Sequence, residues 1–232
     1  MTILTDWNLT LDVDAVFRGQ GADPGILRAR RPGLVSIAEE ALAAAQPLIA
    51  PRVTYRAWDV EGLRHEKIYL AGGRTLSGPL VIELLAAAHQ VIAVLCTVGD
   101  EIDAEVARLM PEDPPLALAF DGVGSAAAEA LGMAVCAYFE QRAAEKGWQA
   151  TLPLSPGMNG WPTDVGQQQL FALLDPDEVN VQLLPSSLMI PRKSVSFLLG
   201  IGPDVSTAGE TCDYCELEKT CRYRRKRNGA SH

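Results

Sequence analysis

The chain has 232 residues, of which 48% are hydrophobic and 21% charged, and its formal net charge is −9. This length suits one large or two small domains, and the composition is typical of a folded soluble protein. The acidic balance excludes general nucleic-acid binding, which needs a net basic surface. Apolar runs shorter than roughly 18 residues and an N-terminus without a signal pattern exclude membrane and secreted classes. We therefore expect a cytoplasmic protein that binds neither nucleic acid nor a membrane.

The first half of the sequence mixes predicted helices and strands without a regular alternation. Asp14 is placed to cap a helix, and the proline of Ser77-Gly78-Pro79 suits the first turn of another. Period-two patterns and β-branched residues mark the strands. In chain order we predict a strand at 8–12, helices at 15–20 and 34–45, strands at 53–60 and 66–70 joined by a turn at 61–63, a helix at 77–89 and a buried strand at 91–97.

The second half is dominated by one long helical tract, which Gly147 is placed to end. The predicted elements are helices at 100–110 and 116–146, a strand at 149–153, a helix at 165–174 with Thr163 as a possible cap, and strands at 179–184 and 195–201. This pattern predicts an α+β fold with a twisted, mostly antiparallel sheet flanked by helices. We expect one domain over 1–203 and a short cysteine-containing basic tail over 204–232.

Two familiar kinds of functional motif do not explain this chain. Gly122-Val-Gly124 matches part of a dinucleotide-binding fingerprint, but the next 20 residues continue as helix where a second strand is required. We therefore interpret these small residues as a close helix-packing site. The three histidines, His65, His89 and His232, have no nucleophile-and-base pattern around them, and we assign no catalytic residue.

The segment 154–162, Leu-Ser-Pro-Gly-Met-Asn-Gly-Trp-Pro, predicts a rigid irregular loop between a strand and a helix. Such a loop exposes backbone donors and acceptors, while Met158 and Trp161 offer sulfur and stacking contacts. These features suit recognition of a small polar molecule with a flat ring. A merely structural turn is the alternative.

Three of the five cysteines form the motif Cys212-x-x-Cys215-x5-Cys221. A two-residue gap lets two sulfurs reach one ion, and the third adds a ligand. We predict an iron–sulfur cluster or a zinc ion here, with Asp213, His232 or an external molecule as the fourth ligand. Metal-free thiols are the alternative. The basic run at 219–227 is either a solvated tail or a docking patch for an acidic partner or anionic cofactor.

Three separated stretches together resemble one family: 155–162, 184–196 and the cysteine tail at 212–225. They are similar to the S-adenosylmethionine-binding reactivation domain of cobalamin-dependent methionine synthase, in its stand-alone form. The long helix that carries Glu129 and the segment 12–21 also fit this family. The resemblance implies an α+β fold that docks on a corrinoid-binding methionine synthase core or a related corrinoid protein.

The resemblance also implies a repair function. One-electron reduction of cob(II)alamin, coupled to methyl transfer from S-adenosylmethionine, restores methylcobalamin on the partner, and a separate electron donor is needed. Methylation traps the scarce reduced cobalt and so draws an unfavourable reduction forward. The residues that the resemblance assigns to the cofactor cleft are Ser155, Pro156, Gly157, Met158, Asn159, Trp161, Glu129, Ser187, Met189 and Ser194.

The sequence departs from the family at two positions. The family has an arginine before the Pro-Gly turn and a tyrosine after it, and Pro153 and Met158 occupy these places here. Loss of the arginine removes a bidentate partner for the carboxylate of the methyl donor. Two alternatives therefore stay open: an iron–sulfur redox protein that reduces a corrinoid protein without S-adenosylmethionine, and a non-catalytic partner that only binds a corrinoid protein.

Overall fold

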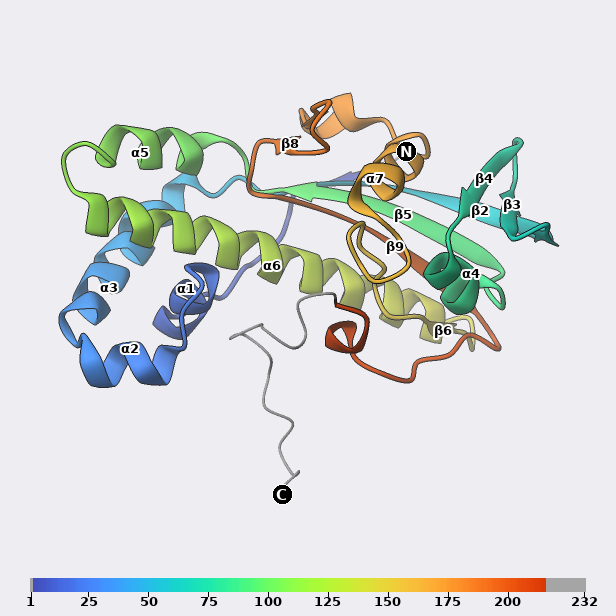
Figure 1. Ribbon diagram of the computed structural model, residues 1–232, viewed down its shortest axis with the longest axis horizontal. Helices are drawn as coiled ribbons and strands as arrows, with labels where there is room; N and C mark the ends of the chain where they lie inside the picture. The colour runs from blue at the N-terminus through green and yellow to red at the C-terminus, as the bar shows by residue number, and fades with distance from the viewer. Residues whose placement is uncertain (1, 216–232) are drawn as a thin grey trace, which may run out of the picture.

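The computed structural model describes residues 2–215, and within them the chain folds around one large antiparallel sheet (Figure 1). The predicted α+β class is confirmed. Cys221, His232 and the basic run at 219–227 lie outside the described residues.

The large sheet has the strand order β4-β3-β2-β5-β9-β6, and β1 pairs with β2. Its central strands β5 and β9 are almost continuously buried because side chains pack on both of their faces. A separate two-stranded sheet joins β7 to β8. The strands are β1 Thr2–Leu4, β2 Arg52–Arg64, β3 Lys67–Leu70, β4 Arg74–Ser77, β5 Gln90–Thr97, β6 Gln149–Ala150, β7 Gln182–Leu183, β8 Met189–Ile190 and β9 Ser194–Gly202.

Seven helices and three short 3-10 turns surround the sheet in the described part of the chain. In Figure 1, α1, α2, α3 and α5 gather around the N-terminal half of the long helix α6. The helices are α1 Val13–Gly19, α2 Pro24–Arg30, α3 Gly33–Ala45, α4 Pro79–Leu85, α5 Glu101–Leu109, α6 Pro114–Ala144 and α7 Thr163–Phe171, and the 3-10 turns are η1 Gln46–Leu48, η2 Pro176–Val179 and η3 Thr211–Tyr214.

Alternation along β5 divides the core between the two faces of the sheet. Val91 and Ala93 face a cluster built with α4, α7 and the loop that carries Trp161. Ile92 and Val94 face the opposite way and pack against α6. A third cluster joins α1, α3 and α5 to the first half of α6. The sheet is therefore covered on both faces, and the 155–161 loop belongs to the face opposite α6.

The helix α6 is long and apolar enough to cross a membrane by length and composition alone. Fourteen of its 31 residues are buried, and 56% of its most apolar 18-residue window is enclosed by the rest of the protein. It packs against the sheet on one side and against α1, α3 and α5 on others. These contacts are those of the core helix of a folded domain.

Two predicted elements in the first half are wrong. Residues 8–12 are irregular, and the Asp12 carboxylate caps α1 by accepting a 2.7 Å bond from the Ala15 N–H, so Asp14 is not the cap. Residues 61–63 do not turn. A register shift between Val60 and Gly62 lets β2 continue to Arg64, and the turn falls at 65–66. A glycine that reads as a turn signal is here part of a bulge.

Other elements differ in length or were not predicted. The helix predicted to reach His89 ends at Leu85, and the strands predicted at 149–153 and 179–184 shrink to the two-residue strands β6 and β7. The helix α2 and the strands β1, β4 and β8 were not predicted from the sequence. Each of these is seven residues or shorter, so its hydrophobic pattern is too brief to stand out.

Candidate functional site

The loop at 155–161 is a closed, hydrogen-bonded turn at the edge of the sheet. Leu154 pairs with Leu198 of β9, which fixes where the loop leaves the sheet. The Gly157 N–H donates to the Trp161 carbonyl at 2.8 Å, and the Trp161 N–H donates to the Met158 carbonyl at 2.9 Å. Gly157 has a φ of 97°, which favours glycine, and a Cβ there would lie 2.8 Å from Thr163 Oγ1. The predicted rigid loop is therefore present.

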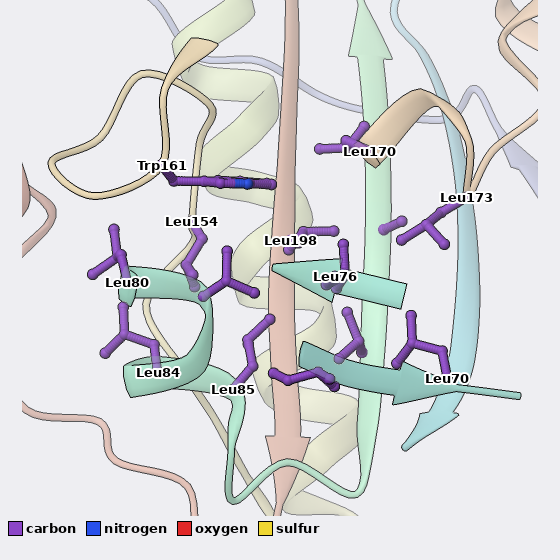
Figure 2. Packing of buried hydrophobic residues seen from close by; sticks show 14 of the residues in the cluster. Leu70, Leu76, Leu80, Leu84, Leu85, Leu154, Trp161, Leu170, Leu173 and Leu198 are labelled. Atoms are coloured by element: carbon purple, nitrogen blue, oxygen red, sulfur yellow. The ribbon is translucent and has the colours of Figure 1, made fainter. Parts of the chain in front are cut away.

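Trp161 anchors this loop from inside the protein. Its side chain is fully buried, and Figure 2 shows the indole lying flat across a leucine cluster that includes Leu154, Leu170 and Leu198. Its Nε1–H points to Gln169 Oε1 at 3.4 Å, and the Gln169 side chain also hydrogen-bonds Ser77. The ring is enclosed by protein atoms, so in this conformation it gives the loop rigidity and has no face open to a ligand.

Met158 also points inward. It is 7% exposed, and its sulfur accepts a 3.3 Å contact from the Ser155 N–H. Asn159 is exposed, while Ser155, Pro156 and Gly157 are half-buried. The polar side chains that the loop offers to a ligand are consequently those of Ser155 and Asn159.

The C-terminal segment at 205–215, which we call the strap, returns to this same loop. The Asn159 N–H donates to the Tyr214 carbonyl at 2.8 Å, and Met158 forms an antiparallel bridge with Cys215. Tyr214 packs against the core that contains Trp161, and Val205 is 3% exposed. In Figure 1 the strap is the red segment that ends in η3. The beginning of the predicted tail thus packs on the domain, with Cys215 of the cysteine motif paired with the loop.

The second predicted stretch, 184–196, runs from the end of β7 through β8 to the beginning of β9. Ser194 pairs with Thr97, and its hydroxyl donates to Thr97 Oγ1 at 2.9 Å and contacts the Pro191 carbonyl at 2.7 Å. Ser194 is four residues from Leu198, a separation of about 13 Å along a strand. Ser187 has a φ of 65° in the turn between β7 and β8, and Met189 packs against a small cluster around Leu95. Only Ser194 therefore lies on β9, beside which the loop begins, whereas Ser187 and Met189 lie in the β7–β8 hairpin.

The helix α6 contributes a polar stripe that includes the predicted residue Glu129. Asp121, Ser125 and Glu129 are spaced by four residues, so they lie on one side of the helix. Glu129 is exposed. Lys193, which the sequence analysis did not single out, is only 7% exposed, and its Nζ donates to Asp121 Oδ1 at 2.6 Å and Ser125 Oγ at 3.0 Å. These partners are distant in sequence, so no local pattern marks the pair.

The four cysteines in the described part of the chain divide into two environments. Burial raises the pKa of Cys96 to about 12, with Cys136 nearby adding to the shift. Burial, together with the Glu140 carboxylate, raises the pKa of Cys136 to about 12. Both therefore stay protonated at neutral pH. Cys212 and Cys215 are half-buried on the strap. The described residues contain no group of three or more His, Cys, Asp or Glu side chains arranged to hold a metal, and Cys221 lies outside them.

Two surface hollows of about 360 Å³ each lie away from the predicted residues. One is lined by Asp59, His89 and Trp148 among others, and the other by Arg74, Thr75 and Gln169 among others. Neither hollow is lined by a residue of the 155–161 loop or by Glu129. The candidate site, at the 155–161 loop and the adjoining part of β9, therefore lies apart from these two hollows.

Comparison with solved structures identifies the fold. No family model matches the sequence, and no curated protein matches it. Among solved structures, the chain is similar to the crystal structure of the MetH reactivation domain bound to AdoHcy, with a TM-score of 0.60 and 15% sequence identity. The similarity covers 92% of this chain and 82% of that chain. The chain therefore has the fold of the MetH reactivation domain, as the sequence resemblance predicted.

Proposed function

We propose that this chain is a stand-alone reactivation factor for a corrinoid protein, and that it binds S-adenosylmethionine at the edge of β9. The observation that carries the proposal is the shared fold over 92% of the chain with a domain that binds AdoHcy. The Ser155-Pro156-Gly157 turn, retained from the family motif, leaves the sheet beside Leu198, so its backbone is held in place before any ligand arrives. Such preorganisation lowers the entropy cost of binding.

Three of the predicted cleft residues have side chains that match part of the methyl donor. The exposed Glu129 carboxylate suits the ammonium group, and the side chains of Ser155 and Asn159 suit its hydroxyls and ring edge. Pro153 leaves the carboxylate of the donor without the family arginine. S-adenosylmethionine, when bound, supplies an electrophilic methyl group. The role of this chain is to hold that group toward the cobalt of a docked corrinoid protein, a proximity effect.

The partner in this proposal is a cobalamin-dependent methionine synthase core, or a related corrinoid protein, together with a one-electron donor. The chain itself then acts as a methyl-donor platform, and the chemistry is completed only in the complex. The cytoplasmic location expected from the sequence stays a prediction.

Calorimetric titration of the full chain with S-adenosylmethionine and with AdoHcy tests the donor site. We expect saturable binding, weakened about tenfold or more by Glu129→Gln, because a charge-assisted hydrogen bond contributes about 1.5–3 kcal/mol. Glu140→Gln, which alters another exposed glutamate of α6, is the matched control and should leave binding unchanged. If both variants weaken S-adenosylmethionine binding equally, Glu129 is not a specific ligand of the donor. Absence of saturable binding would refute the donor-binding proposal.

Reconstitution tests the activity itself. The protein is mixed with a methionine synthase core in its inactive cobalt(II) form, a reductant and S-adenosylmethionine, and methylcobalamin is followed by its absorbance. The expected result is methylcobalamin formation that requires all components. Binding of the donor without methylcobalamin formation under any reductant would instead support the non-catalytic partner.

One observation favours a second candidate, a redox protein that reduces the corrinoid through an iron–sulfur cluster. The bridge between Met158 and Cys215 brings the cysteine motif to the loop where the partner would dock. A brown, iron-containing sample after anaerobic purification supports this candidate. A colourless, zinc-containing sample opposes it.

A further inference from the structure

The strap is held to the 155–161 loop mainly by backbone. The Asn159 N–H donates to the Tyr214 carbonyl at 2.8 Å, and Met158 and Cys215 are paired across an antiparallel bridge. A Cβ at Gly209 would lie 3.7 Å from both Leu152 and the Tyr214 ring, so the strap also passes close to the irregular segment that leads into the loop. Motion of the strap away from the domain would therefore break the Asn159 hydrogen bond.

The strap presents Cys212 and Cys215 on one turn. Cys212 is the second residue of the 3-10 segment η3 and Cys215 directly follows it, and the Cys215 N–H contacts the Cys212 carbonyl at 3.3 Å. Residues three apart in a 3-10 turn lie nearly above one another, so the turn places Cys215 close to Cys212. The turn is stabilised from the other end by a capping box between Glu210 and Asp213. This is the geometry in which a two-residue spacing brings two sulfurs to one ion.

The other two described cysteines do not share this chemistry. Burial raises the pKa of Cys96 and that of Cys136 to about 12, so neither supplies a thiolate at neutral pH. Cys96 faces the α6 side of the sheet, whereas the strap lies at the loop on the other side. A soft metal ion that binds this protein is thus directed to the strap.

The geometry points to a thiolate metal site on the strap, at Cys212 and Cys215, whose occupancy locks the 155–161 loop. Two thiolates from one turn give half of a tetrahedral site for a thiophilic ion such as Zn²⁺. An ion held there opposes opening of η3, and through Tyr214 it opposes loss of the Asn159 hydrogen bond. The metal site and the loop are then linked thermodynamically. This inference concerns the loop of the proposed function but holds whether or not that loop binds S-adenosylmethionine.

The test is a Zn²⁺ titration of the reduced full chain, with hydrogen exchange of the Asn159 amide followed by NMR. A ligand that binds only the docked strap suppresses opening by a factor of 1 + [L]/Kd, so exchange slows up to about 100-fold at 100 times Kd. The Gly166 amide, which donates to the Pro162 carbonyl at the start of α7, is the internal control and should change little. Cd²⁺ in place of Zn²⁺ gives the thiolate charge-transfer absorbance that identifies sulfur ligands.

Matched variants separate the strap from the other cysteines. Cys212→Ser and Cys215→Ser keep the backbone pairing and should abolish both the charge-transfer band and the Zn²⁺ effect on Asn159. Cys136→Ser, in the core, should leave both intact.

Two results would overturn the inference: failure of Zn²⁺ to bind, or binding that leaves Asn159 exchange unchanged. Calorimetry with AdoHcy on metal-free protein distinguishes this failure from failure of the proposed function. Donor binding without a zinc effect would refute only the proposed link between the metal site and the loop. A zinc effect without donor binding would refute only the proposed S-adenosylmethionine site.

Discussion

Some side chains in this protein lie in environments that their residue types do not predict. The sequence predicts that Trp161 is available for stacking on a ligand. In the structure its side chain is buried in the core, and its Nε1–H donates to Gln169. Lys193 reads as a surface cation, yet it is buried against Asp121. A buried charge is stable only when it is paired and hydrogen-bonded, and Ser125 supplies the additional acceptor.

The Lys193–Asp121 pair gives a stability prediction. Asp121→Ala should destabilise the fold by about 3 kcal/mol, because it leaves the ammonium of Lys193 buried without its counter-charge. The double variant Asp121→Ala with Lys193→Met should recover much of that loss, since it removes both charges and keeps the apolar stem. Urea unfolding of the two single variants and the double variant measures the coupling. Additive losses would mean that the pair is not a coupled unit.

At the scale of elements, the small residues of α6 determine how closely the helices approach. A Cβ on Gly122 would lie 2.7 Å from the Val16 carbonyl oxygen, and one on Gly19 would lie 2.3 Å from the Gly122 carbonyl oxygen. The two glycines therefore let the backbones of α1 and α6 touch. The interpretation of Gly122 as a packing residue is confirmed.

Substitution of two glycines in the same helix tests this contact. Gly122→Ala should cost about 1–3 kcal/mol of unfolding free energy, because the backbone of α1 cannot move aside as a flexible side chain would. Gly132→Ala is the matched control. A Cβ there meets Phe197 and Val195 at 3.9 Å, an ordinary contact, and alanine favours the helix by up to about 1 kcal/mol. Thermal unfolding should show a lower Tm only for Gly122→Ala. An equal decrease of the Tm in both variants would refute the packing explanation.

At the scale of the whole molecule, folding holds two thiols in their protonated form. Burial is the main cause that raises the pKa of Cys96 and that of Cys136 from the ordinary 9.0 to about 12. Between these values the unfolded chain has lost protons that the native protein keeps. The stabilisation is thus fully present below pH 9 and declines as the pH rises toward 12.

The alkaline decline of stability can be measured by urea unfolding at several pH values. Two such thiols together contribute a slope of up to about 2.7 kcal/mol per pH unit between these limits. Cys136→Ala should make the decline shallower by up to about 1.4 kcal/mol per pH unit. Any cavity that it creates shifts the whole curve without changing its slope. An unchanged slope in this variant would show that Cys136 does not titrate with unfolding.

Local pattern sufficed for the parts of the fold that carry long, periodic signals. The helix at 34–45, the long helix around Glu129 and the strands near 91–97 and 195–201 were all predicted from sequence, and the structure has them within a few residues. The rigid loop at 155–161 was also predictable, because its prolines and glycines restrict the backbone locally.

Contacts between distant residues were decided only by the tertiary structure. Cys215 of the strap pairs with Met158, which lies 57 positions earlier in the chain, and Lys193 binds Asp121 over a separation of 72 positions. The Trp161 side chain packs into a core formed by α4, α7 and β9. Periodicity and turn chemistry act over a few residues, whereas burial sums contributions from the whole molecule. The sequence by itself therefore determined the class of fold and the loop's rigidity, while the packing of the folded chain decided which of the loop's groups remain available to a ligand.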